Sequence, residues 1–191
     1  MRLLKWFIIG TVVLVALLYA VGPFLPNKAL VERSILIEAP VSVIEECVTD
    51  LEIWEKWEPW GPKDDSMTVQ YGEIRRGLGA SHTWSGKIVG QGERTLTAIN
   101  PGVRIDFTLV FDGDTGVPAF TAFHFDVVSA EETRVTWTFE GELGSNPISR
   151  IIGLFLDDIL GRFYEDGLTS LKNEAIERAN ELVHPPALIP Q

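Results

Sequence analysis

A long amphipathic segment near the C-terminus, residues 147–183, constrains the fold more than any other part of the chain. Ser145 and Asn146 offer N-cap oxygens just before Pro147, a residue that the first turn of a helix tolerates. The two prolines that follow His184 end the helix, because a proline ring disfavours the helical conformation of the residue before it. The apolar residues recur at spacings of mostly three and four, which places them on one helix face: Ile148, Ile151, Ile152, Phe155, Ile159, Phe163, Leu168 and Leu171.

Three glycines interrupt this segment, and each could mark a kink or the start of a second helix. They are Gly153, Gly161 and Gly167. A helix of this length with one apolar face needs a partner surface, and the chain before it supplies mostly short strands. A curved sheet gripping one long helix is therefore the expected arrangement.

Three strands before the helix carry large apolar side chains at alternate positions, so each strand has one apolar face. These residues are Ile105, Phe107, Leu109 and Phe111, then Phe123, Phe125 and Val127, then Val135, Trp137 and Phe139. The opposite face is mostly Thr, Asp and Glu, which is typical of an antiparallel sheet with one covered face. A strand at 30–38, two short helices and about six further strands precede the long helix. Helices and strands do not alternate, so the fold class is α+β.

The N-terminal run of residues 6–25 carries no charge and is long enough to cross a bilayer. A cleaved signal peptide is the alternative, although Leu18-Tyr19-Ala20 lacks a small residue at the first key position of a cleavage site. We favour an uncleaved transmembrane anchor. The chain then divides into three parts: anchor and linker (1–28), one globular domain (29–184) and a C-terminal tail (185–191).

The orientation of this single-pass anchor rests on a small bias in basic residues. Arg2, Lys5 and the terminal amine lie on one side of the apolar run, and Lys28 and Arg33 lie on the other. Cytoplasmic flanks carry the excess of Lys and Arg, so the N-terminus is expected in the cytoplasm and the domain on the extracytoplasmic side.

The charge balance excludes one class of partner. Acidic residues outnumber basic residues 27 to 16, and none of the acidic ones precedes Glu32. Such a surface repels phosphate backbones, so we expect no nucleic-acid partner. The lone cysteine, Cys47, lies among apolar residues in a short predicted helix, and we interpret it as a small core residue.

The most distinctive run holds three tryptophans in seven residues, from Trp54 to Trp60. Trp54 and Trp57 are three apart and would share a helix face, whereas Pro59 directs Trp60 elsewhere. The rings either plug the open end of the sheet against the long helix or line the mouth of a pocket for an apolar ligand. Both roles can hold for different rings.

Taken in order, several local motifs carry a family resemblance over about residues 30–178. They are Ile37-Glu38-Ala39-Pro40, the pattern W-x-K-W-x-P-W from Trp54 to Trp60, Gly77-x-Gly79-Ala80, Trp84-x-Gly86, Thr133 to Trp137, and Tyr164 to Lys172. The sequence resembles membrane-anchored bacterial members of the START-like, polyketide cyclase/dehydrase and lipid-transport superfamily (SRPBCC). The resemblance implies a helix-grip (START/Bet v 1-like) fold, in which the sheet wraps the C-terminal helix around a hydrophobic cavity. Lipid carriers, hormone receptors and cyclases share this fold, so it does not settle the function.

The sequence offers no recognisable catalytic set, metal site or cofactor site. Of the histidines, only His82 shares a strand face that could point inward, because His124 falls on the polar face and His184 at the helix end. No two of them have metal-ligand spacing. His82, Glu165 and Asp166 are the candidates for acid–base chemistry inside a pocket.

Three hypotheses for function follow. The first is membrane-tethered binding of a hydrophobic small molecule or lipid by a carrier or sensor. The second is a cyclase- or dehydratase-like enzyme that acts on an apolar substrate in the same cavity, and the third is a packed domain that only contacts a protein partner. The cavity candidates are Trp57, Trp60, His82, Trp84, Phe107, Phe111, Phe123, Phe125, Trp137 and Phe163.

Overall fold

The computed structural model describes residues 2–111 and 118–183. His184 and the expected tail 185–191 lie outside the described residues. In chain order the elements are α1 (Arg2–Val21), η1 (Gly22–Phe24), β1 (Lys28–Ile37), α2 (Val41–Thr49), α3 (Leu51–Trp57), η2 (Gly61–Lys63), β2 (Thr68–Tyr71), β3 (Ser81–Gly86), β4 (Gly90–Asn100), β5 (Arg104–Phe111), β6 (Ala119–Ser129), β7 (Glu132–Glu142), α4 (Pro147–Gly153) and α5 (Leu156–Val183).

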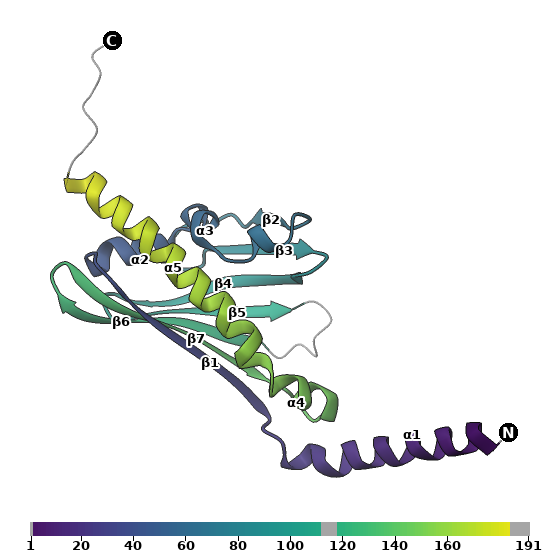
Figure 1. The fold of residues 1–191 in the computed structure, drawn as a ribbon. Coiled ribbons are helices and arrows are strands. Elements are labelled where there is room, and N and C mark those ends of the chain that lie inside the picture. The colour runs from purple at the N-terminus through teal and green to yellow at the C-terminus, as the bar shows by residue number, and fades with distance from the viewer. Residues whose placement is uncertain (1, 112–117, 184–191) are drawn as a thin grey trace.

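The strands form one antiparallel sheet in the order β1-β7-β6-β5-β4-β3-β2. Strands β2 to β7 are joined as successive neighbours, and β1 closes the far edge by pairing with β7. The sheet curves, and α5 crosses its concave side together with α2 and α3 (Figure 1). The predicted α+β helix-grip arrangement is confirmed.

The single long helix expected over residues 147–183 is divided into two helices. The break falls at Leu154 and Phe155, directly after Gly153. The backbone N–H groups of these two residues bond three residues back, to Ile151 and Ile152, which tightens the turn. The side chain of Leu143 fills the space where a Cβ on Gly153 would lie, so the glycine allows α4 to pack closely.

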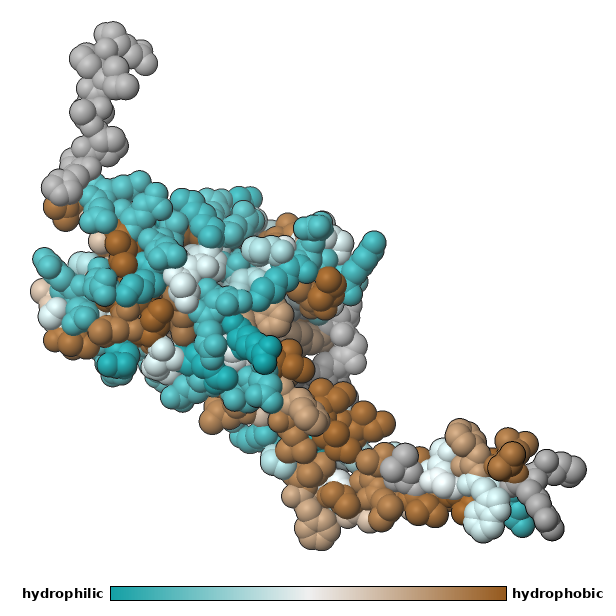
Figure 2. All heavy atoms as spheres, in the orientation of Figure 1, coloured by the Kyte–Doolittle hydropathy of each residue, from teal (hydrophilic) through white to brown (hydrophobic). Residues whose placement is uncertain are grey.

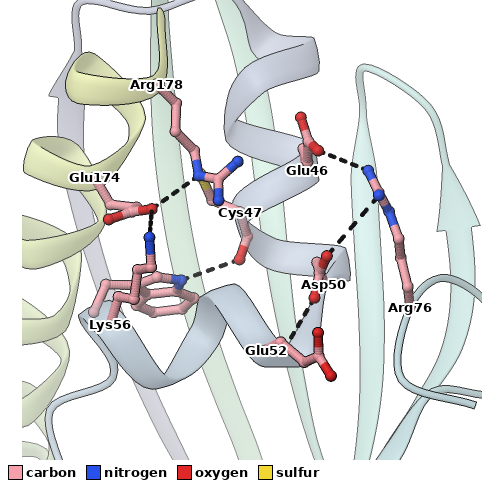
Figure 3. Close-up of polar contacts among 9 residues, drawn as sticks. Glu46, Cys47, Asp50, Glu52, Lys56, Arg76, Glu174 and Arg178 are labelled. Atoms are coloured by element: carbon pink, nitrogen blue, oxygen red, sulfur yellow. Dashed lines mark hydrogen bonds and ion pairs between the residues drawn. The ribbon is translucent and has the colours of Figure 1, made fainter. Parts of the chain in front are cut away.

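Helix α3 carries Trp54 and Trp57 and is tied to its neighbours by polar contacts (Figure 3). Asp50 caps it by accepting a bond from the Glu52 N–H at 3.0 Å. The Trp57 indole donates to the Cys47 carbonyl of α2 at 3.0 Å. Lys56 reaches Glu174 of α5, which also accepts from Arg178 at 2.8 Å. Cys47 itself is fully buried, and burial raises the pKa of its thiol to about 12, as befits a core residue.

The centre of the core is an aromatic cluster between the sheet and the helices. Trp54 stacks on Trp57 with ring centroids 4.6 Å apart, so the two rings share a helix face as predicted. Trp137 of β7 lies between Phe123 of β6, at 4.8 Å, and Tyr164 of α5, at 3.9 Å. Trp137 also donates from its indole nitrogen to Thr121 at 2.7 Å. This stack joins α5 to β7 and β6, on the β1 side of the sheet.

Helix α1 projects away from the domain as an apolar rod (Figures 1 and 2). In the described part of the chain, residues 3–24 form the one helix long and apolar enough to cross a membrane. These properties fit a membrane anchor or a signal sequence. Its end is held against α4, because Arg150 donates to the Gly22 carbonyl at 2.9 Å and Pro147 packs on Gly22.

The close approach of α5 to Trp137 generates a prediction for Gly167. A Cβ at this position would lie 2.8 Å from the Trp137 ring and 3.1 Å from Pro59, two rigid neighbours. We expect Gly167→Ala to lower the free energy of unfolding by about 1–2 kcal/mol, after allowing for the helix-propensity gain of alanine. Thermal unfolding followed by tryptophan fluorescence measures this loss.

Gly161→Ala is the matched control in the same helix. The nearest atoms to its added methyl group belong to the guanidinium of Arg33, the end of a flexible side chain that can move aside at the expense of its exposed ion pairs with Asp157 and Glu165. The loss should therefore be smaller than that of Gly167→Ala. Equal losses would contradict the close packing of α5 against Trp137.

Candidate functional site

The structure contains a cavity of about 420 Å³ between the first half of α5 and the β2–β5 half of the sheet. Helix α3, the loop around η2 and the β3–β4 turn close its sides. The lining is mostly apolar and aromatic, which is the usual character of a small-molecule site. From α5 it includes Leu156, Ile159, Leu160, Phe163 and Tyr164.

The strand register gives the wall of the cavity two rows of side chains. Val69, Trp84 and Phe111 form the row nearer the β3–β4 turn, and Tyr71, His82, Arg94 and Leu109 form the next one. One row further in, Leu96 and Phe107 belong to the closed core, each at most 1 % exposed. The row that contains Arg94 is therefore the inner end of the cavity.

The ten cavity candidates chosen from the sequence fall into two groups. Trp60, His82, Trp84, Phe111 and Phe163 line the cavity. The other five belong to the buried core beside it and are not among the lining residues: Trp57, Phe107, Phe123, Phe125 and Trp137. Alternation placed all of these strand residues on the correct face, but the helix covers only part of that face.

A glycine lets the Trp84 ring lie across the sheet. In the register, Gly92 stands between Trp84 of β3 and Phe111 of β5. A Cβ at Gly92 would overlap the Trp84 ring, so only glycine leaves room for the ring to reach Phe111, where the centroids are 5.8 Å apart. The aromatic wall depends on this glycine.

Asp64 holds the β3–β4 turn against the cavity. Its carboxylate accepts bonds from the N–H groups of Ile88 at 2.7 Å and Val89 at 3.1 Å, both of them lining residues. It also accepts from the Ser66 N–H and hydroxyl. The Ser66 hydroxyl and these backbone donors lower the pKa of Asp64 to about 2, so the carboxylate is ionised at neutral pH.

A stacked pair forms the outer side of the cavity. Trp60 lies on Phe163 with ring centroids 4.4 Å apart, as expected if Pro59 directs Trp60 away from the other two tryptophans. Lys63 sits 4.2 Å above the Phe163 ring and pairs with Asp166 at 2.6 Å.

The three candidates for acid–base chemistry are not brought together. His82 lines the cavity, but Glu165 and Asp166 are exposed on α5 and pair with Arg33 and Lys63. Burial and the neighbouring Arg94 cation lower the pKa of His82 to about 3. The imidazole is therefore neutral at physiological pH.

Arg94 and Tyr164 are two of the lining residues that the sequence reasoning did not identify. Arg94 is buried, and its guanidinium carbon lies 4.3 Å over the Trp54 ring. The sequence signal for Arg94 was its position two residues before Leu96, because side chains two residues apart on a strand lie on the same face. Tyr164 lies one position after Phe163 on α5, where strict helical periodicity assigns only one of the two to the apolar face.

A curved antiparallel sheet that wraps a long C-terminal helix and encloses a cavity defines the helix-grip, Bet v 1-like class of proteins. Protein CV1439 from Chromobacterium violaceum shares the fold with a TM-score of 0.54 and 17 % identity, over 78 % of this chain and 96 % of that one. A point mutant of norcoclaurine synthase from Thalictrum flavum, in complex with a transition-state analogue, has a TM-score of 0.62 and 9 % identity, over 79 % of this chain and 96 % of that one. The hypothetical protein jhp0584 from Helicobacter pylori has a TM-score of 0.57 and 8 % identity, over 76 % of this chain and 87 % of that one. At these identities the likeness concerns the fold alone.

The chain belongs to the family of polyketide cyclases / dehydrases and lipid transport proteins, whose profile matches residues 28–175. This confirms the family that the sequence motifs indicated. No curated protein matched the sequence.

The low pKa of His82 predicts a pH dependence of stability. The pKa of His82 is 6.5 in the unfolded chain and about 3 in the folded chain. Between these two pH values, the unfolded chain binds a proton at His82 that the folded chain does not. Stability should therefore fall as the pH falls through this window, by up to about 1.4 kcal/mol per pH unit.

His82→Gln should flatten that dependence when unfolding midpoints are compared across the window. His124→Gln is the control, because His124 lies on the other face of the sheet and does not line the cavity. A slope that is the same in wild type and His82→Gln would show that His82 is not held neutral by burial.

Proposed function

We propose that this protein binds a hydrophobic small molecule or lipid in the cavity, as a membrane-tethered carrier or sensor. The observation that carries the proposal is the 420 Å³ space itself, with aromatic walls from Trp60, Trp84, Phe111 and Phe163. Burial of an apolar ligand against such walls is favourable at roughly 25 cal/mol per Å² of surface removed from water. The family description, which includes lipid transport, supports the same reading.

Exposed apolar side chains near the cavity support a position at the membrane surface. They extend from the end of α1 over α4 and the start of α5 (Figure 2), and include Phe24, Ile148, Ile152, Leu154, Phe155 and Ile159. An apolar patch of this kind is typical of an interaction or membrane surface. Ile159 belongs both to this patch and to the cavity lining, so a ligand could pass between bilayer and cavity at this point.

The two alternative functions have less support. An enzyme of the cyclase or dehydratase kind would use His82, the one acid–base candidate that lines the cavity, but its low pKa makes it a weak base at neutral pH. Loss of turnover without loss of stability in His82→Ala would favour that alternative. A domain that only contacts a protein partner would need no cavity of this size.

Photolabelling of the full chain in its membrane tests binding. A photoactivatable long-chain alcohol should label cavity peptides that contain Trp84 or Phe111, and Leu160→Trp should reduce this labelling several-fold by filling the cavity. Labelling of α1 reports the amount of probe in the bilayer. Leu182→Trp is the matched control, since Leu182 is an exposed residue of the same helix outside the cavity. Equal cavity labelling in the two variants would count against the proposal.

We also propose that α1 remains uncleaved and places the domain on the extracytoplasmic side. A membrane-impermeant amine reagent should then modify Lys87, an exposed residue of the β3–β4 turn, in right-side-out vesicles. Lys5, on the other side of α1, should react only in inverted vesicles. The opposite pattern would reverse the orientation, and absence of α1 from the mature chain would indicate a signal peptide.

A further inference from the structure

Three buried side-chain nitrogens lack a hydrogen-bond partner in the part of the chain that the structure describes, and all three belong to residues that line the cavity. They are Trp54 Nε1, His82 Nδ1 and Arg94 Nε. Buried polar groups are normally hydrogen-bonded, so each unpaired one requires an explanation. Because all three residues line the same cavity, from α3 and from the sheet, we infer that a ligand completes their hydrogen bonds.

Arg94 is the most unusual of the three. It is only 7 % exposed, and it forms no ion pair or side-chain hydrogen bond with any described residue. Burial lowers its pKa to about 10, although Tyr164 and the Glu58 carboxylate act in the opposite direction, and the guanidinium stays charged at neutral pH. A buried charge is costly unless it is paired.

The other ionisable groups around the cavity are already engaged. Glu55 accepts a bond from the Tyr71 hydroxyl, and Glu58 accepts from the N–H groups of Trp60 and Gly61. Lys63 pairs with Asp166 at the rim. Each of these groups has a partner that Arg94 lacks.

The contact between Arg94 and the Trp54 ring does not remove the need for a partner. The ring face stabilises the charge, at a distance of 4.3 Å. A guanidinium nevertheless has five N–H donors in its own plane, suited to an oxygen anion. Stacking therefore holds the guanidinium in place while its donors remain free.

We propose that the ligand is an amphiphile with an anionic head group, which binds Arg94 at the inner end of the cavity. The apolar body lies in the outer part, against Trp84, Phe111, Leu160 and Phe163. The register supports this direction, because Arg94 lies one row deeper than Trp84 and Phe111. The Trp54 N–H and the neutral His82 beside Arg94 supply further polar contacts for the head. The inference rests on the proposed function and names the ligand class for that same cavity.

The test uses the full chain in its membrane and two photoactivatable probes, a fatty acid and the alcohol of the same chain length, at mildly alkaline pH. Cavity labelling is divided by α1 labelling, which corrects for the amount of each probe in the bilayer. In wild type we expect the acid to label the cavity about tenfold more than the alcohol, since charge-assisted hydrogen bonds are stronger than neutral ones.

Arg94→Met should reduce labelling by the acid about tenfold, so that the acid no longer labels the cavity more than the alcohol does. Arg104→Met is the control, because Arg104 is an exposed residue of β5 that pairs with Asp106 and does not line the cavity. It removes the same charge and should keep the preference for the acid. Acetate should not compete, because it lacks the apolar body.

Each outcome separates this inference from the proposed function. If neither probe labels the cavity of the wild type, both proposals fail. If acid and alcohol label it equally, the anionic head is refuted and hydrophobic binding stands. If Lys63→Met abolishes the preference and Arg94→Met does not, the head group binds at the rim and the assignment to Arg94 is wrong. If Arg94→Met does not fold, Arg94→Lys replaces it: loss of the preference for the acid, or its retention in Arg94→Lys together with loss in Lys63→Met, decides between Arg94 and the rim, and competition between the unlabelled acid and alcohol in the wild type decides whether the head group is anionic.

Discussion

The stacking of Tyr164 on Trp137 is the contact on which the interior depends. The two rings lie 3.9 Å apart and nearly parallel, and Gly167 lets α5 approach the same tryptophan from the next turn. This contact fixes α5 over the β1–β7 side of the concave face. Helix α5 therefore leaves part of the β2–β5 half of the sheet uncovered, and α3 and the η2 loop close the remaining space without filling it. The cavity is thus a consequence of where one helix is held.

The polar interior shows a conflict between stability and function. Elsewhere in the core, polar groups are satisfied: the Trp57 indole donates to Cys47, and the Trp137 indole donates to Thr121. The unpaired nitrogens of Trp54, His82 and Arg94 are exceptions gathered in one place. Natural proteins break such local rules mainly at functional sites, where a ligand restores what the empty fold lacks. A domain selected for stability alone would place an apolar residue at position 94.

The charge distribution and the apolar patch complement this interior. The chain has a formal net charge of −11, so its surface repels free anions in water. An anionic amphiphile would therefore reach Arg94 more readily from a bilayer than from solution. The exposed side chains of α4 and the start of α5, next to the end of α1, provide the apolar side of the domain that such a route requires.

The sequence by itself determined the elements, their faces and the family. Alternation identified the covered side of β5, β6 and β7, and helical spacing placed Leu168 and Leu171 on the covered face of α5, because these periods follow from local backbone geometry. The same spacing assigned four further residues to the covered face, but they are exposed: Ile148, Ile152, Phe155 and Ile159. The sequence did not determine that the helix breaks after Gly153, where Leu143 packs, or which aromatic residues belong to the core and which to the cavity. The position of a residue on one face of a strand predicts only that its side chain is covered. Whether the core or the cavity lies over that side chain depends on where α5 crosses the sheet. The tertiary structure alone decided that Arg94, one of several charged residues on the strands, is enclosed without a partner.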